Sequence, residues 1–217
     1  MSLAVFVDYD GTITDVDTSD VFVRHFAGDG AWDEIEARLN SGELSLRDAM
    51  ALEISFVRGT LDDADALLRA NVRLDPTLPG FVAYCEAAGY PLTVVSSGLE
   101  PLIRRALSRH GLAHVPVVAN PVTPAPEGWR IEFRDDSANG NDKAALVRAA
   151  ERRGYSTVFV GDGRSDYDAA LAAGRRFAKR GRKLEEYLEQ RGVPFERFST
   201  FAEITTLLER GAGFGLV

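Results

Sequence analysis

Five runs of apolar, mostly β-branched residues recur along this 217-residue chain, and helical patterns alternate with most of them. The runs lie at 3–8, 92–96, 115–119, 157–161 and, more weakly, 175–179, and the helical patterns lie at 79–88, 100–110, 142–153 and 166–173. Continuous apolar runs suit strands that are covered on both faces, and their alternation with helices is typical of βαβ units. The sequence therefore predicts an α/β fold with a Rossmann-like, doubly wound parallel sheet. In such sheets ligands bind beyond the carboxyl ends of the strands.

Residues 15–78 break this alternation. Helical patterns near 18–27, 31–41, 45–58 and 62–71 follow one another there without a convincing strand. So long a helical segment after the first strand indicates an inserted helical cap rather than a crossover. We therefore expect an α/β core domain formed by 1–14 and 79–217, and a helical cap domain formed by 15–78.

Two further segments fall outside this plan. Residues 129–134, in a turn-rich stretch, suggest a short outlying strand. The glycine-rich end at 211–217 follows no strand and precedes no helix, which favours a flexible end over a phosphate-binding loop.

The charge of the chain restricts its partners. With 33 Asp and Glu against 25 Lys and Arg, its net charge is −8. This disfavours nucleic acid and an anionic membrane, because both attract clustered positive charge. It leaves room for a small anionic substrate held by a few local donors.

The single cysteine and the start of the chain bear on the compartment. Cys85 lies among apolar residues of a helical pattern and is expected to be a buried structural thiol, since one cysteine makes no internal disulfide. The first residues run directly into a strand, and no stretch reaches the ~20 apolar residues that a membrane span needs. We therefore expect a cytoplasmic protein.

Polar residues gather at the predicted carboxyl ends of the strands. The first strand ends in "DYDGT", which supplies Asp8, Asp10 and Thr12, and the second ends in "VVSSG", which supplies Ser96 and Ser97. The strand at 157–161 runs into "GDGRSD", and "GNDK" begins the helix before it. The residues that these two segments add are Asp162, Asp166 and Lys143. The sheet thus projects four carboxylates, three hydroxyls and a lysine toward one edge.

This set meets the demands of phosphoryl transfer. Carboxylate and carbonyl oxygens are the ligands that Mg²⁺ prefers, and the cation would relieve the repulsion between Asp8 and the Asp162–Asp166 pair. An aspartate can act as nucleophile and form an aspartyl-phosphate. Asp10 is placed to protonate the leaving oxygen and then to activate water. The phosphoryl oxygens would be held by Lys143, the Ser96 hydroxyl and the N–H groups of Gly11 and Ser97.

The four segments, in this order, resemble the motifs of haloacid dehalogenase (HAD) superfamily phosphohydrolases. The resemblance implies that Asp8 is the nucleophile and Asp10 the general acid and base. It also implies Mg²⁺ bound by the side chains of Asp8 and Asp162 and the backbone carbonyl of Asp10, with Asp166 supporting the metal. An aspartate at position 10 points to the phosphatase branch, and the insertion resembles the helical cap of that superfamily.

Within the superfamily, spacing and cap resemble phosphoserine phosphatase-like proteins and the 2-hydroxy-3-keto-5-methylthiopentenyl-1-phosphate phosphatases of methionine salvage. The latter likeness rests on "DYDGTITDVDTSD", on "PGFVAYCEAAGYPLTVVSSG" and on "LEQRGVPFERFSTFAEI", and it suggests a homodimer. Asp17 stands where phosphoserine phosphatases carry a substrate-binding glutamate. No arginine matches the one that holds the substrate carboxylate in those enzymes, which makes phosphoserine a less favoured substrate. The cysteine-rich stretch before the lysine of the salvage enzymes is replaced here by "RDDSANGNDK", which loosens that assignment as well.

Other roles remain open for these residues. Asp17 suits a cap-domain substrate contact and a helix N-cap equally, and Asp166 and Asp162 also suit a helix start. Ser96 and Ser97 also suit plain loop hydroxyls, and Ser96 is favoured as the side-chain ligand because it comes directly after the strand. The whole site suits a Mg²⁺-dependent phosphatase of a small phosphorylated metabolite, a phosphotransferase that uses another acceptor, or a protein that binds phosphate without turnover. An intact acid and base at Asp10 favours an enzyme.

Overall fold

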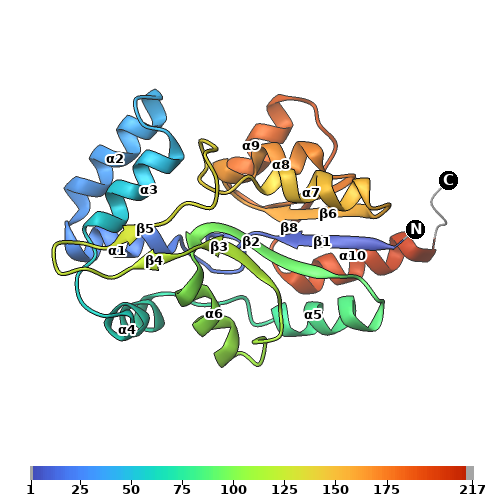
Figure 1. The fold of residues 1–217 in the computed structure, drawn as a ribbon. Helices are drawn as coiled ribbons and strands as arrows, with labels where there is room; N and C mark the ends of the chain where they lie inside the picture. The colour runs from blue at the N-terminus through green and yellow to red at the C-terminus, as the bar shows by residue number, and fades with distance from the viewer. Residues whose placement is uncertain (1, 214–217) are drawn as a thin grey trace. The chain divides into compact units, whose positions relative to one another are not determined.

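The computed structural model describes residues 2–213, and Figure 1 shows their arrangement as a ribbon. The strands are β1 (Leu3–Val7), β2 (Leu92–Leu99), β3 (Val117–Asn120), β4 (Val122–Thr123), β5 (Arg130–Ile131), β6 (Ser156–Gly161), β7 (Arg175–Lys179) and β8 (Glu196–Phe198). The helices are α1 (Thr18–Phe26), α2 (Asp29–Ser41), α3 (Leu46–Ser55), α4 (Leu61–Asn71), α5 (Leu78–Ala87), α6 (Glu100–Arg109), α7 (Lys143–Arg152), α8 (Tyr167–Ala172), α9 (Lys183–Gln190) and α10 (Phe201–Gly213), with a short 3₁₀ turn η1 (Arg164–Asp166). Of the end for which flexibility is predicted, residues 214–217 lie outside the described residues.

Six strands form one sheet in the order β3-β2-β1-β6-β7-β8. The pairs of β1 with β2 and β6, and of β7 with β6 and β8, are all parallel. In β1 and β6 every residue but the first is buried, as expected for strands covered on both faces. Helices α7, α8 and α9 cover one face of β6 and β7, and α5 and α10 lie on the other (Figure 1). The predicted α/β fold with a doubly wound parallel sheet is confirmed.

The described chain divides into two compact units. The first comprises Met1–Ile13, Leu74–Val94 and Lys143–Val217, and the second comprises Thr14–Arg73 and Val95–Asp142. The second unit thus holds residues 15–73 of the predicted cap and also a stretch that the sequence assigns to the core, while residues 74–78 of the predicted cap lie in the first unit. The division into a core of 1–14 and 79–217 and a cap of 15–78 stays a prediction.

The second unit has an apolar centre of its own. Phe22 of α1, Ile54 of α3 and Trp129, which precedes β5, pack in one buried cluster. The indole N–H of Trp129 donates to the carbonyl of Gly59 at 3.0 Å. The outlying strand predicted at 129–134 is present as β5, two residues that pair antiparallel with β4.

Candidate active site

The loop after β1 carries the first group of predicted site residues. Asp8 lies at its start and is 3% exposed. The N–H of Ile13 donates to the carbonyl of Tyr9 at 2.9 Å and closes the loop. Gly11 has a φ of +73°, in the left-handed region that glycine adopts without strain. A Cβ on Gly11 would lie 2.3 Å from Oδ2 of Asp162, so the loop packs directly against the end of β6.

A buried lysine links two of the predicted carboxylates. Nζ of Lys143, the first residue of α7, lies 2.5 Å from Oδ1 of Asp8 and 2.7 Å from Oδ1 of Asp166. It also donates to the hydroxyl of Ser165 at 2.9 Å. Burial lowers the pKa of Lys143, but the charges of Asp166 and Asp8 outweigh this effect and raise the pKa above its ordinary value. The two carboxylates therefore favour the charged form of the lysine.

Asp166 joins this lysine to the loop after β6. Its Oδ2 accepts from the N–H groups of Asp162 and Gly163, both at 2.9 Å, while its Oδ1 faces Lys143. Asp162 in turn accepts at Oδ1 from the hydroxyl of Thr12 at 2.9 Å. The Thr12 side chain, a candidate for substrate binding, thus holds the Asp162 carboxylate in this structure.

Asp8, Asp162 and Asp166 together suit a hard cation. Each offers one carboxylate oxygen, and these three atoms lie within 4.8 Å of one another. Burial raises the pKa of Asp8 well above its ordinary value, and the neighbouring carboxylates raise it further against the opposing effect of Lys143. A divalent cation would relieve this repulsion, and carboxylate oxygens are the donors that Mg²⁺ prefers. The residues present therefore fit Mg²⁺.

Asp10 lies beside this group without belonging to it. The residue is half-buried, and its charge is among those that raise the pKa of Asp8. It is the remaining carboxylate of the loop and is not one of the three aspartates that could share a cation. The predicted bond from its backbone carbonyl to a metal stays a prediction.

Two buried asparagines hold the end of β2 in the second unit. Nδ2 of Asn141 donates to the carbonyl of Ser96 at 2.8 Å, and Nδ2 of Asn120 donates to the carbonyl of Ser97 at 2.6 Å. The hydroxyl of Ser96 accepts from the N–H of Gly98 at 2.8 Å. The hydroxyl of Ser97 is buried and has no partner among residues 2–213. A buried hydroxyl without a partner is costly, which is consistent with a polar group reaching it from outside the chain.

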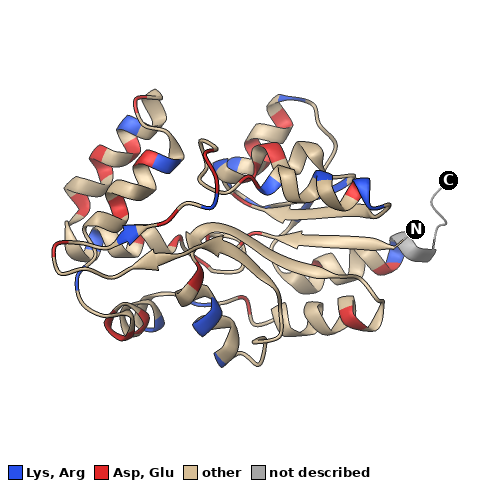
Figure 2. Ribbon diagram, in the orientation of Figure 1, with Lys and Arg blue, Asp and Glu red and all other residues tan. Residues whose placement is uncertain are grey.

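Asp17 caps the first helix of the second unit. Its side chain accepts from the N–H of Ser19 at 2.8 Å at the start of α1. Of the two roles that the sequence leaves open, the helix cap is present, and a substrate contact stays a prediction. Nearby, burial raises the pKa of Glu53 to about 8, and the charge of Asp17 adds to the effect. Figure 2 shows more acidic than basic residues on the neighbouring α2.

Sequence reasoning missed several residues that hold the site. Ser165 accepts a hydrogen bond from Lys143. Its place within "GDGRSD" is the signal from which the sequence could have identified it. Lys179 ends β7, and its Nζ donates to the carbonyls of Gly11 at 2.8 Å and Thr12 at 2.9 Å. A lysine at the carboxyl end of a predicted strand of the same sheet is the signal that could have found it.

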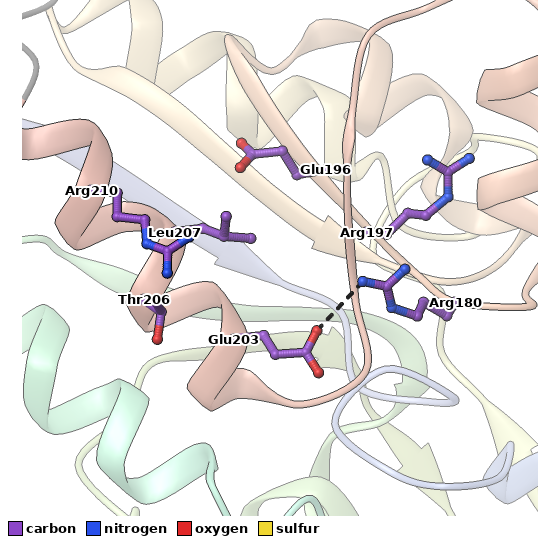
Figure 3. A pocket seen from close by; sticks show the side chains of 7 residues that line it. All are labelled: Arg180, Glu196, Arg197, Glu203, Thr206, Leu207 and Arg210. Carbon is purple, nitrogen blue, oxygen red and sulfur yellow. Dashed lines mark ion pairs between the residues drawn. The ribbon is translucent and has the colours of Figure 1, made fainter.

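A cavity of about 480 Å³ lies between β8 and α10 (Figure 3), lined by Arg180, Glu196, Arg197, Glu203, Thr206, Leu207 and Arg210. None of the predicted site residues lines it. Glu196 is paired with Arg175 at 2.5 Å, and Glu203 lies 3.8 Å from Arg180. This cavity holds no nucleophile beside a base and is not the candidate active site.

Comparison with known proteins places these findings in a family. The family described as haloacid dehalogenase-like hydrolase matches residues 5–171. Among curated proteins, Pdp3-interacting factor 1 of Schizosaccharomyces pombe is 34% identical, over 96% of this chain and 95% of its own length. The polyol phosphate phosphatase of Saccharomyces cerevisiae is 30% identical, over 95% and 92% respectively. A 2-hydroxy-3-keto-5-methylthiopentenyl-1-phosphate phosphatase of Microcystis aeruginosa is 28% identical, over 96% and 98%.

Solved structures show the same fold. A phosphoserine phosphatase captured as an analogue of its phospho-aspartyl intermediate superposes with a TM-score of 0.73 at 18% identity. The match covers 95% of this chain and 98% of that one. Within residues 2–213, no helix has both the length and the apolar character needed to cross a membrane.

Proposed function

The chain belongs to the haloacid dehalogenase-like hydrolase family, and we propose that this phosphoric monoester hydrolase works through an aspartyl-phosphate on Asp8 with Mg²⁺ as cofactor. The observation that carries the proposal is the buried Lys143 between Asp8 and Asp166. A cation held at one oxygen of a buried carboxylate orients that carboxylate. Its positive charge also lowers the electrostatic repulsion that an anionic phosphate meets as it approaches. The family and the phosphatases among its relatives support the class of reaction, a small phosphorylated substrate included.

In the proposed first half-reaction, Asp8 is the nucleophile. Its Oδ1 is held by Lys143, and no donor among residues 2–213 bonds its Oδ2, so Oδ2 is the oxygen that attacks phosphorus. The bond from phosphorus to the ester oxygen breaks, and Asp10 gives its proton to the leaving alcohol. An aspartyl-phosphate remains on Asp8.

In the second half-reaction, Asp10 acts as base. It takes a proton from water, the water oxygen attacks phosphorus, and the acyl-phosphate bond breaks at the phosphorus atom. Inorganic phosphate leaves and the Asp8 carboxylate is restored. The Ser96 hydroxyl, Lys143 and the N–H groups of Gly11 and Ser97 are proposed to hold the phosphoryl oxygens. The side chains of Thr12 and Ser97 and the cap residue Asp17 stay candidates for substrate contact.

Mg²⁺ would be held by the side chains of Asp8 and Asp162 and the backbone carbonyl of Asp10, with Asp166 supporting the site. When bound, it would neutralise negative charge on the phosphate and on the facing carboxylates. The hydroxyl of Thr12 fixes the Asp162 carboxylate for this role, and Asp166 fixes the N–H groups of the same loop.

The arginines of the second unit argue against phosphoserine. Phosphoserine would need a free cation for its carboxylate, and the arginines nearest α3 are Arg47 in its first turn and Arg58 after its end. Arg58 donates to the carbonyls of Ser55 at 2.6 Å and Val57 at 3.0 Å. Arg47 lies 4.3 Å above the ring of Phe133. Both guanidinium groups thus already have contacts within the unit.

Two substrate classes remain in competition. The sequence resemblance favours the methionine-salvage intermediate 2-hydroxy-3-keto-5-methylthiopentenyl-1-phosphate. A relative named as the phosphatase of that compound is 28% identical to this chain. A phosphorylated polyol is favoured by the 30% identical polyol phosphate phosphatase and by the unpartnered hydroxyl of Ser97, which suits a substrate rich in hydroxyl groups. Cytoplasmic location, a homodimer and the absence of nucleic-acid binding stay predictions.

The test is release of inorganic phosphate from a panel with Mg²⁺ or with EDTA. The panel contains polyol phosphates, the methionine-salvage intermediate, phosphoserine, sugar phosphates and nucleotides. We expect Mg²⁺-dependent release from one of the first two classes. Asp8→Asn should lower kcat by roughly 10⁴-fold or more, and Asp10→Asn by about 10²–10⁴-fold, both with an unchanged melting temperature.

Two outcomes would contradict the proposal. Substantial turnover by Asp8→Asn would exclude the covalent route, and full activity in EDTA would exclude the metal. A phosphotransferase, the rival within the family, would instead form a phosphorylated product that rises with the concentration of an added alcohol acceptor.

A further inference from the structure

Lys179, on β7, contacts the loop that follows β1 and carries Asp8 and Asp10. In the sheet order, β6 lies between β1 and β7, so β1 and β7 are roughly 10 Å apart. The loop after β1 leans over the end of β6, where Gly11 packs against Asp162, and there a long side chain of β7 can meet it. The half-buried Lys179 does so from the last position of β7. Its Nζ donates to the carbonyls of Gly11 at 2.8 Å and Thr12 at 2.9 Å. Lysine suits this place because it combines a long stem with three donors.

These two hydrogen bonds set the direction of peptide groups in the turn. A peptide is planar and trans, so fixing the carbonyl of Gly11 also fixes the N–H of Thr12 on the opposite side. The hydroxyl of Thr12 bonds Oδ1 of Asp162, and Gly11 packs against the other oxygen of that carboxylate. Lys179 thus holds Gly11 and Thr12. These two residues lie between the aspartates of the loop, Asp8 and Asp10, and the carboxylate of Asp162.

From this geometry we propose that Lys179 is a positioning residue, whose ammonium group holds the turn at Gly11 and Thr12 in the form in which Asp8 and Asp10 react. The inference rests on the proposed function. Lys179 contacts the carbonyls of Gly11 and Thr12, so its loss should slow turnover of bound substrate more than it weakens binding. A displacement of about 1 Å at reacting groups lowers rates by about 10²-fold.

The experiment removes the ammonium group and then restores it chemically. Lys179→Cys is treated with 2-bromoethylamine, which converts the cysteine to S-aminoethylcysteine, a side chain that ends in an ammonium group like lysine. The native Cys85 is fully buried, and burial raises the pKa of its thiol to about 12, so it stays unmodified in the folded protein. Mass spectrometry verifies a single adduct.

We expect Lys179→Cys to lose about 10²-fold in kcat with KM nearly unchanged, and aminoethylation to restore most of it. The adduct made with iodoacetamide is of similar size and ends in a neutral amide, and it should restore clearly less kcat than aminoethylation does. Lys183→Cys, at an exposed lysine of α9, is the matched control and should keep full kcat before and after treatment. If Lys179→Cys melts early, Lys179→Gln, with two amide N–H donors and no charge, takes its place and should give an intermediate kcat.

Unchanged kcat in Lys179→Cys, or equal rescue by the neutral adduct, would overturn the proposal. If the wild-type protein releases no phosphate from any ester, the proposed function fails, and hydrogen exchange of the 9–14 loop decides about Lys179 alone. Faster exchange in Lys179→Cys than in the wild type, reversed by aminoethylation, would then support the contact. Equal exchange in the wild type and in Lys179→Cys would overturn it.

Discussion

At the scale of single residues, Gly11 and Gly163, two of the glycines in the aspartate motifs, are under different constraints. Gly11 has a φ of +73°, and an added Cβ would meet Oδ2 of Asp162 at 2.3 Å. Gly163 has a φ of −118° and no atom within 4 Å of such a Cβ. The left-handed backbone conformation and the clash with Asp162 each disfavour a side chain at Gly11, and neither applies at Gly163.

We therefore predict that Gly11→Ala destabilises the protein by roughly 1–3 kcal/mol and abolishes most phosphatase activity, because Asp162 must move. Gly163→Ala is the matched control and should change neither. Urea unfolding and phosphate release measure the two effects. Equal tolerance of both substitutions would show that the packing of Gly11 on Asp162 is wrong.

At the same scale, the residues at strand ends could be predicted and their partners could not. Asp8, Asp162 and Lys143 follow from the motifs and from the parallel sheet, whose carboxyl ends share one edge. Nothing in the sequence indicates that the hydroxyl of Thr12 bonds Asp162 instead of standing free for a substrate. Such choices depend on distances of a few tenths of an ångström, which residue type and spacing do not determine.

At the scale of elements, three helices of the second unit meet around a buried acid. Glu53 of α3 is 8% exposed and lies among Asp17 before α1, Asp20 of α1 and Glu36 of α2. Burial is the main cause that raises its pKa from 4.5 to about 8. The folded state therefore keeps a proton on Glu53 that the unfolded chain releases, and stability is lost as pH rises from about 4.5 through about 8.

Glu53→Gln should remove this pH dependence, because the amide carries no charge at any pH. We expect it to raise the melting temperature by several degrees at pH 8.5, about 2–4 °C per kcal/mol for a chain of this size, and to leave it nearly unchanged near pH 5. Glu34→Gln, on the exposed side of α2, is the control. A pH profile of thermal unfolding that is the same for wild type and Glu53→Gln would contradict the raised pKa.

The elements themselves were predictable where periodicity is strong. The eight helices expected from the sequence correspond to α1–α8, and the five expected strands correspond to β1, β2, β3, β6 and β7. The third strand begins at Val117 instead of the predicted residue 115, because Pro116 has no N–H to donate to a ladder. The elements β8, α9 and α10 were not predicted. The strand is only three residues long, too short for its alternation to stand out.

At the scale of the whole molecule, the order of the strands creates the site. β1 lies between β2 and β6, so the loop that carries Asp8 and Asp10 leaves the sheet beside the loop that carries Asp162 and Asp166. The parallel arrangement was predictable from the apolar runs, and the contact of Lys179 across β6 was not, since it depends on strand order as well as on strand direction. The division into units was only partly predictable: the helical segment forms one unit together with Val95–Asp142.

The most direct test of the account is to detect the phosphoryl group on Asp8. Wild type and Asp10→Asn are mixed with Mg²⁺ and the best substrate of the panel, quenched in acid within one turnover, and digested for mass spectrometry. The account predicts a wild-type peptide that contains Asp8 and is heavier by one phosphoryl group. The same peptide should form more slowly in Asp10→Asn, which lacks the acid of the first half-reaction, and should be missing from Asp8→Asn. Phosphate release by the wild type with no phosphorylated Asp8 at any quench time, or with the group on another residue, would contradict it.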